Sequence, residues 1–203
     1  MSEIYRYPEY YDIAYSFRDL SREVDVMEEA IGRFSGIPVT RVFEVACGNS
    51  PHMAEWVRRG YRYSGIDLSE DMLAYSRVKA DPLGDKAELI RADLTNFSIG
   101  EPADFAYAML GSIYAQDTAG LIGHLDCMAR TVKPGGLYFL DWCIEFDPFT
   151  SAANAWVEER DGISVGLTYL SNLVDRVEQT LEERITLDVD DHGEKKVIEQ
   201  VGR

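Results

Sequence analysis

The sequence has few cysteines and no long apolar runs. Only three cysteines occur among 203 residues, and they form no C-x-x-C pair, so neither a disulfide framework nor a cysteine zinc site is indicated. No run approaches the about 18 apolar residues of a membrane span, and the first residues lack the apolar core of a signal peptide. These absences predict a protein of a reducing compartment, and we expect it to be cytoplasmic and not membrane-bound.

Basic residues are also scarce. The chain has 20 lysines and arginines against 36 aspartates and glutamates, a formal charge of −16. Nucleic-acid binding depends on clustered positive charge, so we expect no nucleic-acid partner. What the chain does have is 46% hydrophobic and 11% aromatic residues, which is enough for a globular core.

The first part of the chain alternates predicted helices and strands. Apolar residues at helical spacing predict a helix from Leu20 to Phe34 that ends at Ser35-Gly36, and Ser50-Pro51 has the pattern of a helix start. A turn is expected at Lys133-Pro134-Gly135-Gly136. Five short apolar runs predict strands: Val42–Ala46, Tyr61–Ile66, Ala87–Ala92, Phe105–Leu110 and Leu137–Trp142.

This alternation predicts an α/β fold with a Rossmann-like, mainly parallel sheet and helices on both faces. After Pro148 the apolar period becomes two, which predicts a C-terminal antiparallel meander of three strands with a turn at Asp191-His192-Gly193. We therefore expect an N-terminal lid and first helix over 1–36, a core over 37–147 and an antiparallel extension over 148–203. A ligand is expected beyond the carboxyl ends of the parallel strands.

Acidic residues end three consecutive predicted strands. Glu44 precedes the turn Ala46-Cys47-Gly48-Asn49-Ser50, in which small residues let backbone amides approach a ligand. Nineteen residues beyond Gly48, Asp67 ends the second strand, where a carboxylate can accept both hydroxyls of a ribose.

Asp93 ends the third strand, where it is placed to accept the exocyclic amine of an adenine stacked against Leu68 or Leu94. Each acid taken alone is more simply a helix cap or a loop residue. Three acids at consecutive strand ends, beside a small-residue turn, favour a nucleoside site instead.

The region from about Tyr11 to Trp142 resembles the class I S-adenosylmethionine-dependent methyltransferases, especially their small-molecule branch. The segment from Glu44 to Ser50 is similar to the family's acidic, glycine-rich first motif, although Ser50 stands where the family usually has a glycine. Asp67 and Asp93 are similar to its ribose-binding and adenine-side acids. The Lys133-Pro134-Gly135-Gly136 turn is similar to the one before its fifth strand.

The resemblance implies S-adenosylmethionine as the cofactor. It implies that Met72, in Ser69-Glu70-Asp71-Met72-Leu73, flanks the adenine, and that the turn residues Ala46 and Gly48 lie against the cofactor. The family usually completes its sheet with a further helix and an antiparallel strand pair, and this final strand pair is absent from the expected fold.

Two tyrosine-containing segments are candidates for the substrate side. Met109 to Tyr114, after the fourth strand, is the expected floor of the pocket, with Met109 toward the cofactor and Tyr114 toward the substrate. The segment Tyr11 to Tyr15 is similar to an N-terminal segment that closes over the cofactor, which would place Tyr15 on the cofactor and Tyr11 on the substrate. A helix that packs its aromatic side chains on a core is an equal alternative.

The histidines His52, His124 and His192 are too scattered for a metal site, and we expect surface or helix positions for them and no bound metal. Met53 and Trp56 are expected in a helix core.

The sequence therefore predicts an enzyme that transfers a methyl group from S-adenosylmethionine to a nitrogen or oxygen of a small metabolite. No catalytic base is identified, and a homodimer is left open. An NAD-dependent oxidoreductase is one alternative, but the chain lacks the G-x-G-x-x-G fingerprint and Glu44 would repel a phosphate. A non-catalytic S-adenosylmethionine-binding scaffold is the other.

Overall fold

A computed structural model describes residues 3–113, 117–141, 151–177 and 180–202. The chain forms two compact units, one from Asp19 to Ile144 and the other from Met1–Arg18 together with Glu145–Arg203. This division differs from the expected boundaries, because the first 18 residues belong with the C-terminal extension and the following helix belongs with the core.

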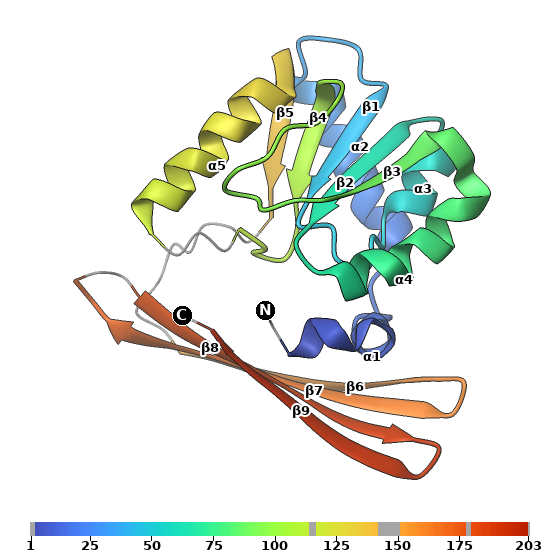
Figure 1. The fold of residues 1–203 in the computed structure, drawn as a ribbon, viewed down its shortest axis with the longest axis vertical. Coiled ribbons are helices and arrows are strands. Elements are labelled where there is room, and N and C mark those ends of the chain that lie inside the picture. The colour runs from blue at the N-terminus through green and yellow to red at the C-terminus, as the bar shows by residue number, and fades with distance from the viewer. Residues whose placement is uncertain (1–2, 114–116, 142–150, 178–179, 203) are drawn as a thin grey trace. The chain divides into compact units, whose positions relative to one another are not determined.

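The first unit is built on five parallel strands in the order β3-β2-β1-β4-β5 (Figure 1). The strands are β1 (Arg41–Val45), β2 (Arg62–Asp67), β3 (Ala87–Arg91), β4 (Ala103–Ala108) and β5 (Val132–Leu140). The helices are α2 (Leu20–Phe34), α3 (Met53–Arg58), α4 (Glu70–Ala80), the 3-10 helix η2 (Asp81–Lys86) and α5 (Thr118–Thr131). The predicted Rossmann-like sheet is confirmed.

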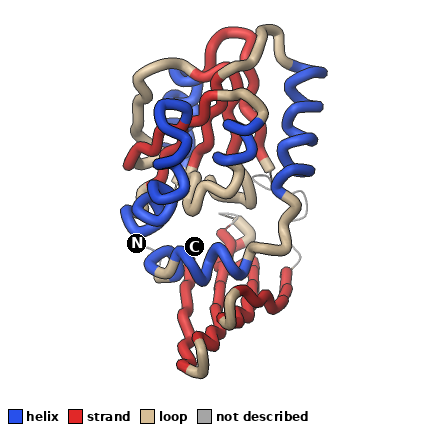
Figure 2. Tube along the Cα trace, turned by 90° about the vertical axis from the view of Figure 1, so that its right-hand side faces the viewer, coloured by secondary structure: helices blue, strands red, loops and turns tan. Residues whose placement is uncertain are grey.

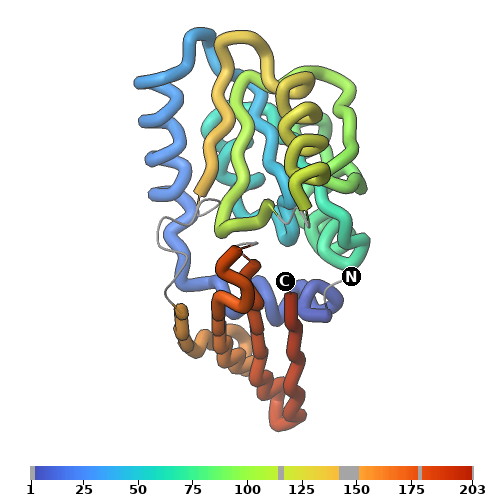
Figure 3. The backbone as a smooth tube through the Cα atoms, turned by 90° about the vertical axis from the view of Figure 1, so that its left-hand side faces the viewer, coloured from blue at the N-terminus to red at the C-terminus, as the bar shows by residue number. Residues whose placement is uncertain are grey.

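Alternate strand residues point to opposite faces of this sheet. One cluster packs residues such as Val42 and Phe105 under Met27 of α2 and Trp56 of α3. A second cluster packs the alternate strand positions under α5. Figure 3 shows α2 and α5 on opposite sides of the strands.

Two details of the first unit differ from prediction. The expected turn at Lys133–Gly136 is an irregularity inside β5, where Ala103 pairs with Val132 but Phe105 pairs with Leu137. Helix α3 begins at Met53, so Ser50 is not its N-cap.

The sheet is anchored at its amino end by Asp104, which is 3% exposed. Its carboxylate accepts hydrogen bonds from the amides of Thr40 and Arg41 and from Lys133 Nζ, at 2.7–3.0 Å. Burial alone would raise the pKa of Asp104, but these donors outweigh it and lower the pKa.

The second unit contains a four-stranded antiparallel sheet in sequential order. Its strands are β6 (Ala152–Arg160), β7 (Ile163–Asp175), β8 (Thr180–Asp191) and β9 (Glu194–Gly202). The predicted meander is therefore one strand short, because β6 was not recognised. Most of β6 is exposed, and its alanines and glutamates are poor strand formers. The turn before β9 is confirmed, with positive φ at His192 and Gly193.

The N-terminal segment covers one face of this antiparallel sheet. The 3-10 helix η1 (Ile4–Arg6) and helix α1 (Pro8–Ala14) bury Ile4, Ile13 and Ala14 against the inward side chains of the strands. Figure 2 shows this helical segment lying along the strands. The Tyr10 hydroxyl donates a 2.8 Å hydrogen bond to Asp191, and Trp156 Nε1 donates to the Ala14 carbonyl.

Among the described residues, no helix has the length and apolar character needed to cross a membrane.

Candidate functional site

The parallel sheet brings the predicted site residues of four strands to one edge. Strand β1 lies between β2 and β4. From β1 the chain adds β2 and then β3 on one side, and it returns to the other side of β1 to form β4. A crevice at the carboxyl ends of strands is expected where the strand order reverses. The turns after β1 and β4 are therefore neighbours at this edge.

The turn after β1 has an unusual backbone. Ala46, Gly48 and Ser50 all have positive φ, at 52°, 51° and 47°. Left-handed backbone is costly for a residue with a side chain, and such strain concentrates at functional sites. A Cβ added at Gly48 would meet no atom within 4 Å, so open space faces the turn at this residue.

Asp67 connects this turn to the end of β2. One carboxylate oxygen accepts from the Gly48 amide and the other from the Ser69 amide, both at 2.8 Å. Burial raises the pKa of Asp67, and the amides of Ser69 and Gly48 lower it in part. The carboxylate is only half-buried, so it retains acceptor capacity toward a ligand.

An apolar surface flanks Asp67. Leu68 follows it directly and is 53% exposed, which is unusual for a leucine beside a buried turn. Met72 lies in the first turns of α4 but is only 1% exposed. Leu68 was expected against an adenine from its place after Asp67, and Met72 from the family resemblance. Of the two, only Leu68 presents substantial surface.

The loop after β3 joins the same edge. The Ala92 amide donates to the Asp67 carbonyl at 3.0 Å, which brings the Asp93 segment beside the end of β2. Asp93 is exposed, and hydrogen bonds from the Thr95 amide and hydroxyl lower its pKa. The Leu94 carbonyl accepts from His124 Nδ1 of α5 at 2.9 Å.

Glu44 lies at the same edge but inside the protein, at 3% exposure. Its carboxylate accepts hydrogen bonds from Tyr63 at 2.5 Å and from Tyr107 at 2.9 Å. Burial, and then the charge of Glu44, raise the pKa of both tyrosines well above the usual range, so both hydroxyls stay protonated donors at neutral pH.

His52 extends this buried network to α2. Its Nε2 donates to Glu23 at 2.7 Å, and its Nδ1 lies 3.5 Å from Glu44. His52 and His124 are both fully buried. His52 is the N-cap residue just before α3, so the expected surface or helix position is not confirmed for it. His124 is a helix residue as predicted, and His192 is exposed.

The sequence alone did not reveal this network. Glu44 pairs in register with Tyr107, and Tyr63 lies on the strand at its other side. Strand alternation could have placed these side chains on one face once the pairing was known. Met53 and Trp56 are buried in the core, as predicted.

The turn after β4 completes the edge. Leu110 and Gly111 have positive φ. The Leu110 amide donates to the Asp141 carboxylate and the Gly111 amide donates to the Asp141 backbone carbonyl, at 3.0 Å each. Met109 is half-buried against the α2 and α3 cluster. Tyr114, the predicted substrate residue that follows, lies outside the described residues.

Tyr11 and Tyr15 belong to the second unit. Their ring centroids are 4.6 Å apart, and Tyr15 also makes an edge contact with Trp156. Burial raises the pKa of Tyr15. Both side chains are half-buried on their own unit, and their part in a ligand site stays a prediction.

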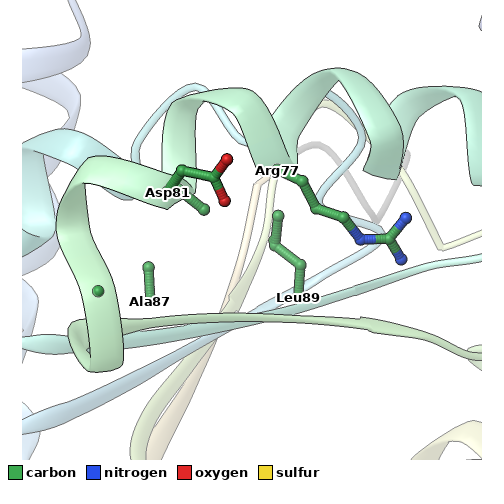
Figure 4. A pocket seen from close by; sticks show the side chains of 6 residues that line it. Arg77, Asp81, Ala87 and Leu89 are labelled. Atoms are coloured by element: carbon green, nitrogen blue, oxygen red, sulfur yellow. The ribbon is translucent and has the colours of Figure 1, made fainter.

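The pocket in Figure 4 is not this site. It is lined by α4, η2 and the start of β3, including Arg77, Asp81, Ala87 and Leu89. Ala87 is the first residue of β3, so the pocket opens at the amino end of the strand. Among the described residues, no cluster of histidine, cysteine or acidic side chains has the arrangement of a metal site.

Comparisons with known proteins agree with this geometry. Residues 42–136 match a family model described as a methyltransferase domain. The dTDP-3-amino-3,4,6-trideoxy-alpha-D-glucopyranose N,N-dimethyltransferase of Streptomyces venezuelae is 28% identical over 131 residues, which are 61% of this chain and 52% of that protein. A ubiquinone biosynthesis O-methyltransferase of Aromatoleum aromaticum is 24% identical over 64% of this chain and 55% of that protein. The chain thus spans about half the length of these curated relatives.

Solved structures share the fold over most of the chain. DesVI of Streptomyces venezuelae has a TM-score of 0.81 and 23% identity, over 96% of this chain and 81% of that one. The sugar N-methyltransferase KedS8 of Streptoalloteichus has a TM-score of 0.77 and 24% identity, over 95% of this chain and 76% of that one. Residues 42–136 thus match the methyltransferase domain model, and the chain has the Rossmann-like methyltransferase fold that DesVI and KedS8 share.

Proposed function

We propose that this protein transfers the methyl group of S-adenosylmethionine to a nitrogen or oxygen of a small metabolite and leaves S-adenosylhomocysteine. The observation that carries the proposal is Asp67, a half-buried carboxylate held by the Gly48 and Ser69 amides beside the exposed Leu68. An acceptor beside an apolar surface suits the ribose and adenine of a nucleoside.

The residues at the edge fit this cofactor. Asp67 would accept the ribose hydroxyls, Leu68 and Leu94 would contact the adenine, and Asp93 would accept its exocyclic amine. The space at Gly48 admits the ligand close to the backbone. Ala46, Met72 and Met109 are proposed to lie near the bound cofactor. The carboxylate of Glu44 favours a cationic ligand in the turn and disfavours the pyrophosphate of NAD.

When bound, the cofactor supplies the electrophile, a methyl group on a positively charged sulfur. The contribution of the chain is then mainly to orient the reactants and exclude water, and alignment of this kind can contribute about 7–11 kcal/mol. Tyr11 and Tyr114 are proposed to orient the acceptor, and Tyr15 to close on the cofactor. The acceptor's new bond to the methyl carbon would form as the carbon–sulfur bond breaks, and the proton of the methylated acceptor would be released to water.

The class of acceptor can be narrowed as part of the proposal. The first curated relative is named as an N,N-dimethyltransferase of an amino sugar nucleotide, and KedS8 is named as a sugar N-methyltransferase. CalS10 of Micromonospora echinaspora, also similar in fold, is named as an amino pentose methyltransferase with S-adenosylmethionine bound. These names support a sugar amine as the first acceptor class to test.

A thermal-shift comparison of S-adenosylhomocysteine with NAD tests the cofactor. At about 100 times its dissociation constant, a ligand stabilises the folded state by about 2.7 kcal/mol, a rise of roughly 5–10 °C for a chain of this size. We expect this rise with S-adenosylhomocysteine only. Stabilisation by NAD alone would favour the oxidoreductase, and stabilisation by neither would reject the proposal.

Turnover separates the enzyme from a binding scaffold. The protein is incubated with S-adenosylmethionine and a panel of nucleotide-linked amino sugars, other amines and phenols, and S-adenosylhomocysteine is measured by mass spectrometry. We expect release that depends on the acceptor. Binding without release on any acceptor would support the scaffold. A homodimer and a cytoplasmic location also stay proposals, and light scattering on the purified protein tests the first.

Substitution of Gly48 by alanine tests the turn. The new methyl group would occupy the open space in which we place the cofactor, and φ of +51° adds about 1 kcal/mol of strain. We expect S-adenosylhomocysteine binding to weaken at least tenfold, as measured by calorimetry, while the protein stays folded. Alanine at Gly193, a hairpin glycine with φ of +93°, is the control that brings strain without a loss of affinity.

A further inference from the structure

Helix α5 contacts the loop 93–97, which follows β3, through one of its faces. His124 and Cys127 are three residues apart and lie on the same face of the helix. His124 Nδ1 donates to the Leu94 carbonyl at 2.9 Å. The Phe97 amide donates to the Cys127 sulfur at 3.3 Å. The helix therefore holds the backbone of this loop, and in Figure 1 the chain after β3 crosses the sheet towards α5 before it enters β4.

The loop contains a turn from Asp93 to Asn96. The Asn96 amide donates to the Asp93 carbonyl at 3.0 Å and closes the turn. The peptide that joins Leu94 to Thr95 is the central peptide of this turn. The central peptide of a turn can adopt two opposite orientations, as in turns of types I and II. Its hydrogen bonds therefore decide which orientation the loop has.

Both ends of this central peptide are hydrogen-bonded. Its amide, that of Thr95, donates to Asp93 Oδ1 at 2.8 Å, and its carbonyl, that of Leu94, accepts from His124. The Thr95 hydroxyl also donates to Oδ1, at 2.7 Å, so Oδ2 is the oxygen of Asp93 that can accept from a ligand. Because a peptide is planar, a fixed carbonyl also fixes the amide. His124 thus orients the Asp93 carboxylate through one peptide.

The surroundings of His124 determine which ring nitrogen carries the proton. The side chain is fully buried, and the Leu94 carbonyl can only accept, so Nδ1 must be a donor. On the other side of the ring, Nε2 lies 2.8 Å from the hydroxyl of Tyr138 in β5, which can donate to it. The neutral ring with its proton on Nδ1 satisfies both contacts. His124 therefore connects the loop to the sheet.

We propose that His124 sets the selectivity for adenine without touching the ligand, because it fixes the peptide that orients Asp93. This inference rests on the proposed function, in which Asp93 accepts the exocyclic amine of the adenine. If the peptide turned over, the Leu94 carbonyl would face the Asp93 carboxylate, and two acceptors repel each other. His124 is a positioning residue, and its loss should weaken recognition of the amine rather than of the rest of the cofactor.

Two ligands measure the recognition of the amine. S-adenosylhomocysteine has the exocyclic amine, and S-inosylhomocysteine has an oxygen in its place. The wild-type protein should bind S-inosylhomocysteine at least about tenfold more weakly, because Asp93 loses a donor and faces an acceptor. The readout is the ratio of the two dissociation constants, measured by calorimetry. A general loss of structure would change both constants together and leave their ratio unchanged.

Asparagine and glutamine at position 124 form a matched pair of variants. His124→Asn places an amide N–H near the position of Nδ1 and keeps the donor to Leu94. His124→Gln places its amide near the position of Nε2 and keeps only the contact with Tyr138. We expect the ratio to stay within about twofold of wild type in His124→Asn and to fall below about threefold in His124→Gln. Tyr138→Phe should leave the ratio unchanged.

Gly123→Ala moves the same loop without altering the histidine. A Cβ at Gly123 would come within 2.8 Å of the Thr95 carbonyl oxygen, so the loop must shift away from α5. We expect the ratio to fall in this variant as well. The control is Gly32→Ala in α2, where a new Cβ would meet no atom within 4 Å and the ratio should not change.

An undiminished ratio in His124→Gln would overturn the inference, and so would an equal loss in His124→Asn and His124→Gln. If His124→Gln does not fold, an undiminished ratio in Gly123→Ala overturns it. A wild-type protein that binds both ligands equally would also overturn it, because His124 would have no selectivity to set, while the proposed methyl transfer would stand. If the wild-type protein does not bind S-adenosylhomocysteine at all, the proposed function fails instead.

Discussion

Asp67→Asn weakens S-adenosylhomocysteine binding by about tenfold to a hundredfold, since a hydrogen bond to a charged acceptor contributes roughly 1.5–3 kcal/mol. The amide keeps the size of the side chain but replaces one acceptor oxygen with a donor. That donor would face either the Gly48 amide or the Ser69 amide, which are both donors themselves. The dissociation constant is measured by calorimetric titration.

The control for this variant is Asp104→Asn at the opposite end of the sheet. Asp104 is also a buried carboxylate that accepts backbone amides, but it lies at the amino end of β4, away from the candidate site. We expect Asp104→Asn to lower the thermal midpoint and to leave the dissociation constant of the folded protein unchanged. An unchanged dissociation constant in Asp67→Asn would remove Asp67 from the site.

The same carboxylate predicts how binding depends on pH. Burial raises the pKa of Asp67 above the ordinary value of 3.8. A protonated carboxyl group is a poorer acceptor for ribose hydroxyls, so affinity should fall as the pH decreases through this raised pKa. The fall should therefore begin at a higher pH than an exposed aspartate would give, and it should be absent in Asp67→Asn.

Glu44→Ala is expected to destabilise the fold by about 1–3 kcal/mol for each buried hydroxyl that it leaves without an acceptor. The substitution leaves the hydroxyls of Tyr63 and Tyr107 without their shared acceptor. The free energy of unfolding is measured by denaturant titration. Tryptophan fluorescence is a suitable probe, because Trp56 Nε1 donates to the Tyr107 hydroxyl at 3.1 Å.

Glu88→Ala is the matched control, since Glu88 is an exposed strand carboxylate on β3. Its effect on the free energy of unfolding should stay within about 0.5 kcal/mol. If Glu44→Ala costs less than 1 kcal/mol, or no more than Glu88→Ala, then the buried network does not stabilise the fold in the way its geometry implies.

The sequence by itself determined the parallel sheet and its order of elements. Strands buried on both faces are short apolar runs in the sequence, and the apolar residues of Leu20–Phe34 have helical spacing. Both signals are local, so they can be recognised without knowledge of the fold. The order of the Glu44 to Ser50 turn, Asp67 and Asp93 along the chain was enough to predict the domain family. The sequence did not predict strand β6, because an exposed strand of alanines and glutamates has no such apolar pattern.

Only the tertiary structure decided how those acids differ. Asp67 receives backbone amides, Asp93 is exposed on its own loop, and Glu44 is enclosed by tyrosines from two other strands and by His52. These surroundings depend on strand register and on helices distant in sequence, which no local pattern encodes. The left-handed backbone at Ser50 has the same origin, because the tight connection between β1 and α3 imposes a conformation that a serine would not choose alone.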